Sequence, residues 1–251
     1  MAGAILISNK GAVSMADFAE QMNPSTLAEA RRAEFRQAVR VQGSWLAAGE
    51  KRVLVWMAER MPRWVNSDHL TVIGFAAQIA TGLCYALARS DRRMLLWAIV
   101  CLAVNWFGDS LDGTLARVRQ KQRPRYGFYV DHIIDSIGAV AMMVGLALSG
   151  YMHPAVAVGL LVAFLLLSIQ SYLATYTLGE FHLSFWRFGP TELRLLLVIG
   201  NLALLKWAWV IHGKYRLFDI GGAIGLAGMA LMLAVFALKN TVRLYREERV
   251  G

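Results

Sequence analysis

The stretch "GDSLDGTLARVRQKQRPRYGFYVDHIID" covers residues 108–135 and decides how the rest of the chain is interpreted. It holds four aspartates in two pairs, on either side of a basic segment: Asp109 with Asp112, and Asp131 with Asp135. Long apolar segments adjoin both pairs. An ionised carboxylate at the edge of hydrocarbon is costly unless it is paired, so these aspartates mark a candidate functional site.

The chain around this stretch has the composition of a membrane protein. Of its 251 residues 57% are hydrophobic. A segment of about 18 or more apolar residues is long enough to cross the hydrocarbon layer of a bilayer. Three segments of this kind are nearly uninterrupted, and three more contain or adjoin a charge: 70–88, 155–173 and 220–238, then 94–107, 133–148 and 195–211. Because helices are the open elements that satisfy their backbone in lipid, we predict an all-α integral membrane protein with six transmembrane helices.

The basic residues predict how the chain is oriented in the membrane. The formal net charge is +9, and lysine and arginine gather in 31–52, 117–125 and 239–249. Six spans would place all three segments on one side, which should be the cytoplasm because basic loops favour that side. Three arginines in 89–93 fall on the opposite side and weaken the bias. The basic segments suit anionic membrane lipids, and no soluble basic domain is present that would favour nucleic acid.

These observations divide the chain into three regions. We predict an N-terminal cytoplasmic and interfacial helical segment, a six-helix membrane domain and a basic cytoplasmic tail: 1–65, 66–240 and 241–251. In the first region, four apolar residues at helical spacing predict an amphipathic helix: Val53, Trp56, Met57 and Met61. Such a helix could lie in the membrane interface or pack on the rest of the protein, and the sequence leaves both open.

Small residues in the predicted spans suggest close helix packing. Gly221 and Gly225 form a GxxxG pair in the last span. This pair allows two helices to approach closely, either within one subunit or across a homodimer. Cys84 and Cys101 both fall in predicted spans, so we expect reduced packing residues instead of a disulfide or metal pair.

The spacing of the aspartates predicts that they meet. Asp109 and Asp112 are three residues apart and Asp131 and Asp135 four, so each pair occupies one face of a helix. The two helices are consecutive and should be antiparallel neighbours, with both pairs at their cytoplasmic ends. Four carboxylates so placed repel one another. Divalent ions with a preference for oxygen, such as Mg²⁺, Mn²⁺ or Ca²⁺, would neutralise them; the alternative is a solvated helix cap that pairs with the basic loop.

These residues resemble the signature of the CDP-alcohol phosphotransferases. Every fixed position is filled, with nine residues between the two halves: Asp109-x-x-Asp112-Gly113-x-x-Ala116-Arg117 and Gly127-x-x-x-Asp131-x-x-x-Asp135. The resemblance extends over roughly 60–240 and also implies six spans. It implies phospholipid synthesis at the cytoplasmic membrane face, in which an acceptor hydroxyl attacks a CDP-alcohol and CMP leaves.

The resemblance also implies roles for single residues. The metal ligands would hold two Mg²⁺ or Mn²⁺ ions: Asp109, Asp112, Asp131 and Asp135. Asp135 could in addition deprotonate the acceptor. The nucleotide contacts would be Asn66, Thr71, Asp109, Gly113, Ala116, Arg117 and Gly127. Asn66 and Thr71 belong to "NSDHLT" (66–71), where family members often have a proline in place of Ser67, and a polar helix cap is the alternative for this segment.

Two details favour one branch of the family. Asp131-His132-Ile133-Ile134-Asp135 resembles the DH-x-x-D form of the choline and ethanolamine phosphotransferases, and residues 177–194 resemble their segment with Gly-Pro and a glutamate. In that branch diacylglycerol is the acceptor, and His132 and Glu192 would activate its hydroxyl. The alternatives are a polar neighbour of the metal site for His132 and a helix cap for Glu192. The stretch between Arg117 and Gly127 lacks the serine- and leucine-rich character of the eukaryotic enzymes.

Three other functions fit the sequence less well. The nearest is a phosphatidyltransferase of the same family that uses CDP-diacylglycerol as donor and a soluble alcohol as acceptor. A divalent-cation transporter is more distant, because its site should lie near the bilayer midplane and not at helix ends beside a basic loop. The intact signature argues against a degenerate family member without activity.

Overall fold

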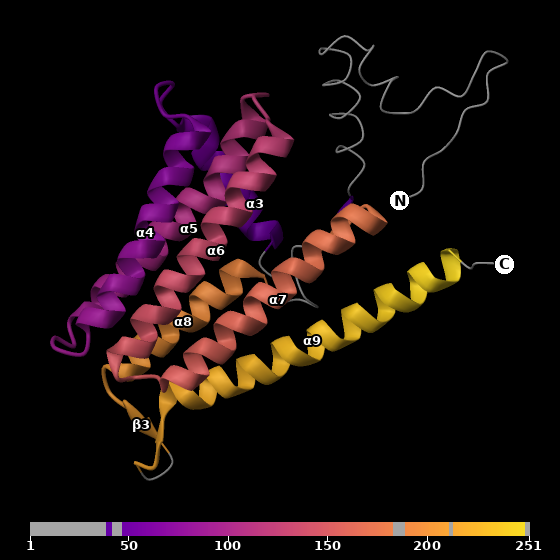
Figure 1. The fold of residues 1–251 in the computed structure, drawn as a ribbon. Coiled ribbons are helices and arrows are strands. Elements are labelled where there is room, and N and C mark those ends of the chain that lie inside the picture. Colours follow the sequence, from indigo (N-terminus) through magenta and orange to yellow (C-terminus); the bar gives the residue numbers. More distant parts are fainter. Residues whose placement is uncertain (1–38, 42–46, 183–188, 211–212, 249–251) are drawn as a thin grey trace, which may run out of the picture. The chain divides into compact units, whose positions relative to one another are not determined.

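The structure is a computed structural model, and it describes residues 39–41, 47–182, 189–210 and 213–248. The described residues form seven helices (Figure 1): α3 (Ala47–Arg60), α4 (Ser67–Leu87), α5 (Met94–Val118), α6 (Pro124–Ser149), α7 (Pro154–Leu178), α8 (Pro190–Leu204) and α9 (Leu217–Glu247). Short strands pair in parallel, β1 (Val39–Val41) with β2 (Glu180–His182), and antiparallel, β3 (Trp209–Val210) with β4 (Tyr215–Arg216). Residues 1–38 of the predicted N-terminal segment lie outside the described residues.

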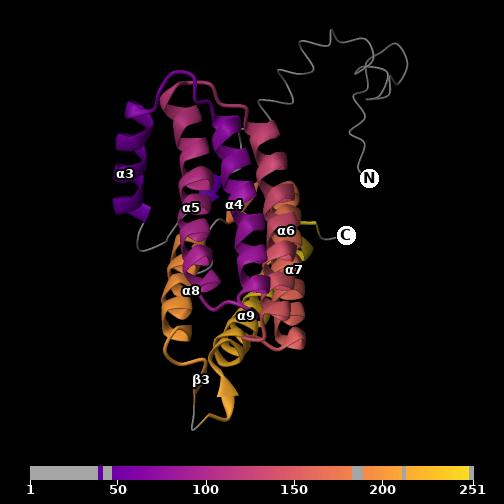
Figure 2. The same cartoon turned by 90° about the vertical axis from the view of Figure 1, so that its left-hand side faces the viewer.

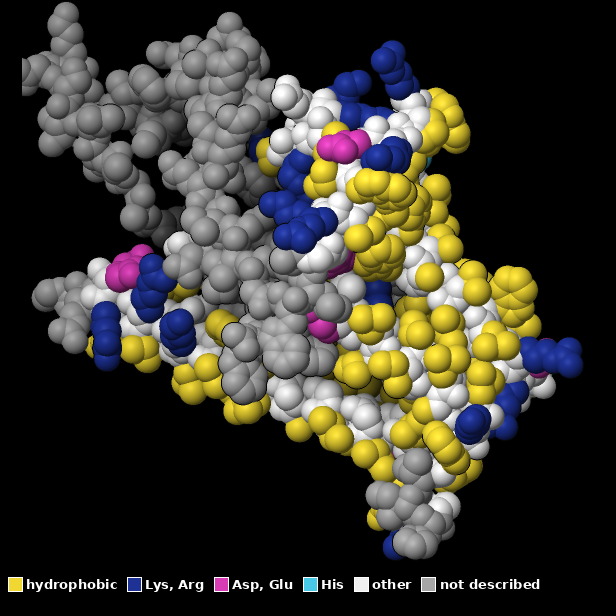
Figure 3. Space-filling view, turned by 180° about the vertical axis from the view of Figure 1, so that it is seen from behind, with side chains coloured by type: hydrophobic (Ala, Val, Ile, Leu, Met, Phe, Trp, Pro, Cys, Tyr) yellow, Lys and Arg dark blue, Asp and Glu magenta, His cyan; other side chains and the backbone are white. Residues whose placement is uncertain are grey.

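Five helices are long and apolar enough to cross a membrane: α4, α5, α6, α7 and α9. The chain therefore has the helices of a multi-pass membrane protein, as its composition predicts. Figure 3 shows the broad hydrophobic surface that one face of the molecule presents, with many basic side chains toward its edges. α9 continues through most of the predicted basic tail to Glu247.

The structure differs from the sequence prediction at the segment 195–211. Here α8 begins earlier, with Pro190 in its first turn, and ends at Leu204, before Lys206. Its 15 residues would span about 22 Å, less than the roughly 30 Å of the hydrocarbon layer. The charged Lys206 follows the end of the helix, and the hairpin of β3 and β4 comes next, with Gly213 in a left-handed conformation before β4. Six transmembrane helices are therefore not confirmed by helix length.

The arrangement of the three helices around the aspartates also differs from the prediction. α4 packs against both α5 and α6, while α5 and α6, each described along its whole length, do not pack closely against each other. Figure 2 shows α4 between them. The consecutive helices α5 and α6 are thus not direct neighbours, because the small residues that allow close approach lie on α4. The aspartate pairs instead face each other across a space bordered by α4.

Glycines allow α4 to approach both of its partners. A Cβ atom added at Gly108 on α5 would lie 2.5 Å from the backbone nitrogen of Gly74 on α4. One added at Gly145 on α6 would overlap the backbone carbonyl of Gly82 on α4. Since backbone atoms cannot rotate away as a side chain can, these contacts fix the separation of the three helices and so the separation of the aspartates.

Replacing Gly145 with alanine should therefore destabilise the bundle. We expect a loss of about 1–3 kcal/mol, because the helices have to move apart. The melting temperature of the purified protein in detergent measures this. Gly228→Ala on α9 is the matched control, since no atom of the described residues lies within 4 Å of its added Cβ, and it should melt at or above the wild-type temperature because alanine favours a helix. Equal melting temperatures for the two variants would contradict the packing argument.

The two glycines of the Gly221–Gly225 pair lie in different surroundings. An added Cβ at Gly225 would meet Leu160 of α7 at 3.5 Å, whereas no atom lies within 4 Å of one at Gly221. Gly222, between them, lies closest to α7, against Val156. The close approach within the subunit therefore uses Gly222 and Gly225, and a homodimer remains a prediction.

The predicted amphipathic helix is present as α3. Its buried Leu54 and Ala58 form a small core with residues of α5, including Leu111 and Leu115, and Met57 and Met61 pack against this core. The other two residues of the predicted face, Val53 and Trp56, are 49% and 55% exposed. α3 thus packs on the membrane domain, and its outer side retains apolar residues of the kind that suit a membrane interface.

Candidate active site

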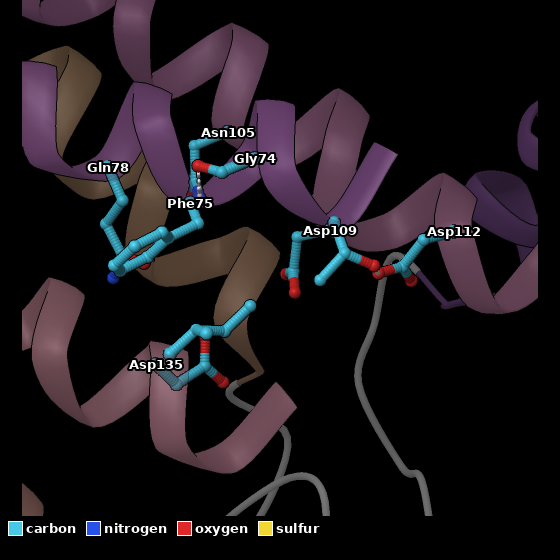
Figure 4. Close-up of a pocket in the computed structure, with 9 residues that line it drawn as sticks. Gly74, Phe75, Gln78, Asn105, Asp109, Asp112 and Asp135 are labelled. Carbon is cyan, nitrogen blue, oxygen red and sulfur yellow. Dashed lines mark hydrogen bonds between the residues drawn. The ribbon is translucent and has the colours of Figure 1, made fainter. Parts of the chain in front are cut away.

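Three of the four signature aspartates line one small cavity. Asp109 and Asp112 reach it from α5, and Asp135 reaches it from α6 on the other side (Figure 4). Its volume, about 10 Å³, is about that of one water-sized sphere. Asp131 does not line the cavity, but its charge interacts with those of Asp112 and Asp135. The prediction that the two pairs meet is thus supported by the geometry, although the helices reach this arrangement through α4.

Asp112 is the most firmly held of these carboxylates. Thr71 of α4 donates a hydrogen bond from its hydroxyl to Asp112 Oδ2 at 2.6 Å, and the backbone N–H of Gly113 donates to Oδ1. Ser67, at the start of α4, donates to the Asp112 carbonyl at 2.9 Å. Asp112 is 6% exposed, so the first turn of α4 fixes both its backbone and its side chain.

Asp109 is paired with an arginine that sequence reasoning did not assign. Arg194 of α8 donates from Nη2 to Asp109 Oδ2 at 2.5 Å and from Nε to Asn105 Oδ1 at 2.8 Å. Asn105 in turn donates to the Gly74 carbonyl at 3.0 Å. The Arg194 side chain is 15% exposed, and its Nη1 is buried without a hydrogen-bond partner. A cation from α8 therefore neutralises part of the acidic site.

A signal for Arg194 exists in the sequence. It is the cation at the start of the apolar run "LRLLLVIGNLAL" (193–204). An ionisable residue in such a run is by default a candidate for a functional site, with a partner inside the bundle. The identity of that partner could not be read from the sequence, because Asp109 is 85 residues away.

His132 lies beside the cavity but turns toward α7. Its ring lies 4.1 Å from that of Phe128 and 4.8 Å, edge-on, from that of Tyr172, measured between ring centres. Its Nδ1 is hydrogen-bonded to the Phe128 carbonyl of the preceding turn. That contact favours the tautomer with a proton on Nδ1. His132 is not among the residues that line the cavity.

The helix-capping alternatives for Asn66 and Glu192 are confirmed. Asn66 Oδ1 accepts a hydrogen bond from the backbone N–H of His69 at 2.9 Å, at the start of α4. Glu192 Oε2 accepts one from the backbone N–H of Gly189 at 2.9 Å, at the start of α8. Side chains that accept such bonds satisfy donors that a helix leaves unpaired. The nucleotide role of Asn66 and the proton role of Glu192 stay predictions.

The remaining signature residues lie around the open ends of α5 and α6. Arg117 is exposed and donates to Thr114 Oγ1 at 2.9 Å. Of the residues that the structure describes, a Cβ added at Gly113 would meet only the Arg117 side chain, at 3.5 Å or beyond, and one at Gly127 would meet none within 4 Å. Ala116, which lies between these glycines in the sequence, is partly buried. Among the described residues no atom requires glycine at these two positions, so their open sides leave room for a ligand.

The donors around the cavity suit a hard divalent cation. Every charged group that lines it is a carboxylate, and Thr71 and Asn105 add neutral oxygens. Such donors favour Mg²⁺ or Mn²⁺ over zinc. Within the described residues, no three His, Cys, Asp or Glu side chains are already close enough to chelate one ion. The donor types fit the ion, and Asp109 would bind it through Oδ1, because its Oδ2 accepts from Arg194.

One comparison with known proteins identifies a family. A family model described as CDP-alcohol phosphatidyltransferase matches residues 64–238. The match begins just before α4, ends within α9, and contains all four aspartates together with Arg194. It covers more than half of the chain.

Proposed function

The chain belongs to the CDP-alcohol phosphatidyltransferase family, and from this we propose that it is a metal-dependent transferase that makes a phospholipid. It would move a substituted phosphate group from a CDP-alcohol to an acceptor hydroxyl and release CMP. The observation that carries the proposal is the convergence of Asp109, Asp112 and Asp135 from two helices on one cavity.

In this reaction the acceptor oxygen forms a bond to the phosphorus distal to cytidine, and the bond from that phosphorus to the CMP oxygen breaks. Asp109, Asp112, Asp131 and Asp135 would hold two divalent ions, which when bound supply positive charge to the pyrophosphate and to the departing CMP. Thr71 and the Gly113 amide keep Asp112 oriented for this task. The exposed Arg117 would bind a nucleotide phosphate.

A cavity of about 10 Å³ cannot hold a nucleotide. The CDP-alcohol would therefore bind over the cavity, against the open sides of Gly113 and Gly127, with only its phosphates reaching the carboxylates. Glycine at these positions leaves space for the nucleotide next to the backbone of α5 and α6.

Among the three candidates for the base, the contacts favour Asp135. It lines the cavity, whereas His132 packs on Phe128 and Tyr172 and Glu192 caps α8. A general base has to come within hydrogen-bond reach of the hydroxyl that it deprotonates. We therefore assign the acceptor proton to the Asp135 carboxylate and supporting roles to His132 and Glu192.

We further propose that α8 is a sixth membrane crossing, with the site and both termini toward the cytoplasm. Two contacts at opposite ends of α8 support this. Arg194 in its first turns pairs with Asp109, and the Leu204 carbonyl at its end accepts from Arg92, which precedes α5. α8 therefore runs antiparallel to α5 and covers the same depth as residues 94–109.

The donor is proposed on sequence grounds. The DH-x-x-D form favours CDP-choline or CDP-ethanolamine with diacylglycerol as acceptor. A specific observation favours the second candidate, CDP-diacylglycerol with a phosphate-bearing soluble alcohol. Arg194 lies beside the cavity with Nη1 unpartnered, and a guanidinium binds phosphate well. A neutral diacylglycerol needs no such group.

Release of CMP by the purified enzyme tests the proposal and separates the candidates. With Mg²⁺ or Mn²⁺, CMP should appear only when a matching donor and acceptor are both present. CDP-choline, CDP-ethanolamine and CDP-diacylglycerol are each offered with diacylglycerol, glycerol phosphate and inositol phosphate. If CDP-diacylglycerol is the only donor that supports turnover, the choline or ethanolamine assignment is refuted, but the proposed reaction type stands. If no combination of donor and acceptor releases CMP, and proteoliposomes that contain the protein take up Mn²⁺, the transferase is refuted and a transporter is favoured.

A further inference from the structure

A second carboxylate connects the three helices α3, α5 and α8. Glu50, in the first turn of α3, accepts three hydrogen bonds on Oε1. The donors are Trp106 Nε1 at 2.8 Å, Thr191 Oγ1 at 2.7 Å and Ser110 Oγ at 3.4 Å. Trp106 and Ser110 belong to α5, and Thr191 belongs to α8. Glu50 itself lies outside the signature and outside the matched residues 64–238.

The positions of these donors relate Glu50 to the site. Ser110 directly follows Asp109 on α5. Thr191 precedes Arg194 by three residues on α8, and residues three apart lie on neighbouring parts of one helix face. The contact between Glu50 and Thr191 therefore holds the first turn of α8, and Arg194 reaches Asp109 and Asn105 from the same part of the helix.

The first turn of α8 needs such a fixed point. α8 has only 15 residues, and much of its surface is open: Leu193, Leu195, Leu196, Ile199 and Leu202 are all at least 46% exposed. Few packed side chains thus oppose a rotation of this short helix about its axis. A rotation would move the Arg194 guanidinium away from Asp109. Hydrogen bonds to a charged carboxylate are stronger than neutral ones, so Glu50 suits the task.

We infer that Glu50 is a positioning residue, which holds α8 against α5 so that Arg194 meets Asp109. α3 would then be part of the catalytic unit and not only a helix at the membrane interface. Its apolar residues share a core with Leu70 of α4 and with Leu111 and Leu115 of α5, whereas the Glu50 carboxylate extends the connection to α8. For its effect on turnover this inference rests on the proposed function.

Glu50→Ala tests the inference by kinetics. We expect kcat for CMP release to fall on the order of tenfold, since a displaced group close to the chemistry costs this much or more, while KM for the CDP-alcohol changes little. Glu50→Gln keeps an accepting oxygen and should recover most of the rate. Thr191→Val should reproduce the loss, and adding Glu50→Ala to it should have no further effect. Glu59→Ala, exposed on the same helix, is the control and should match the wild type.

A combination with Arg194→Gln decides whether Glu50 acts through the arginine. In the Arg194→Gln background, Glu50→Ala should leave kcat unchanged. Melting temperatures in EDTA give a second answer without substrate: the drops caused by the two changes should be less than additive. Independent effects in both measurements, or equal effects of Glu59→Ala and Glu50→Ala, would overturn the inference. A wild type that releases no CMP would refute the proposed function, and the melting temperatures would still decide the role of Glu50.

Discussion

Asp112→Asn should abolish CMP release and leave the protein folded. Asparagine has the same shape and keeps an oxygen that can accept from Thr71, so the first turn of α4 stays in place. The negative charge that would hold a divalent ion is lost. We expect kcat to fall by at least a hundredfold to a thousandfold, on the order seen when one preorganised electrostatic group of an active site is removed. The measurement is CMP release at saturating donor, acceptor and Mn²⁺.

For stability, we expect the opposite of the effect on activity: Asp112→Asn should not destabilise the metal-free protein. Asp112 is almost fully buried near Asp109 and Asp131, and a buried charge without a cation is unfavourable. In EDTA, Asp112→Asn should therefore melt at or above the wild-type temperature. Mn²⁺ should raise the melting temperature of the wild type more than that of the variant, because a ligand that binds more tightly stabilises the folded state more.

Each of these two measurements has an outcome that would contradict the metal-site assignment. Wild-type rates in Asp112→Asn would remove Asp112 from the chemistry. A melting temperature well below that of the wild type in EDTA would give Asp112 a structural role instead. Glu59→Gln, which removes one exposed carboxylate of α3 that does not line the cavity, controls for the loss of negative charge and should leave both the rate and the response to Mn²⁺ unchanged.

The helices and the aspartate pairs could be predicted because their signals are local. Apolar runs of sufficient length give α4, α5, α6, α7 and α9, and the spacing of Asp109 with Asp112 and of Asp131 with Asp135 places each pair on one face. The motif around them is also local, with its fixed positions within 27 residues, from Asp109 to Asp135. Such signals depend on neighbouring residues only, so a single sequence contains them.

The parts that sequence reasoning missed depend on contacts between distant residues. The position of α4 between α5 and α6 follows from glycines on three helices, such as Gly82 against Gly145. No period in the sequence identifies which glycines will face each other. α8 began earlier than predicted because Pro190 is compatible with a first helical turn, although the apolar run starts only at Leu195.

The sequence predicted that the site needs positive charge, but it did not identify the arginine that supplies part of it. Four carboxylates require positive charge, and this requirement correctly indicates a site. The sequence suggested metal ions or the basic loop as the source, and two residues of that loop make other contacts: Arg123 pairs with Asp68, and Arg119 donates to carbonyls before α4. The cation found at the cavity is Arg194, which reaches Asp109 from a helix four elements later in the chain.

Arg194→Gln should lower the stability of the metal-free protein and make that stability depend on divalent ions. Without the guanidinium, Asp109 loses an ion pair and Asn105 loses a donor. We expect a loss of about 2 kcal/mol, typical of a hydrogen bond to a charged group, measured as a lower melting temperature in EDTA. Saturating Mn²⁺ should recover most of this difference, because a divalent ion at Asp109 replaces the missing charge. Turnover should persist at a rate reduced on the order of tenfold.

Two further variants show whether the charge or the shape of Arg194 matters. Arg194→Lys keeps the charge but not the fork that contacts Asp109 and Asn105 together, so its melting temperature in EDTA should fall between those of the wild type and Arg194→Gln. Asp109→Asn combined with Arg194→Gln removes both charges and should melt above Arg194→Gln alone. If the double variant melts lower by the sum of both single losses, the two side chains act independently. Arg194 would then be a structural arginine, and the acidic cavity would owe its stability to other groups.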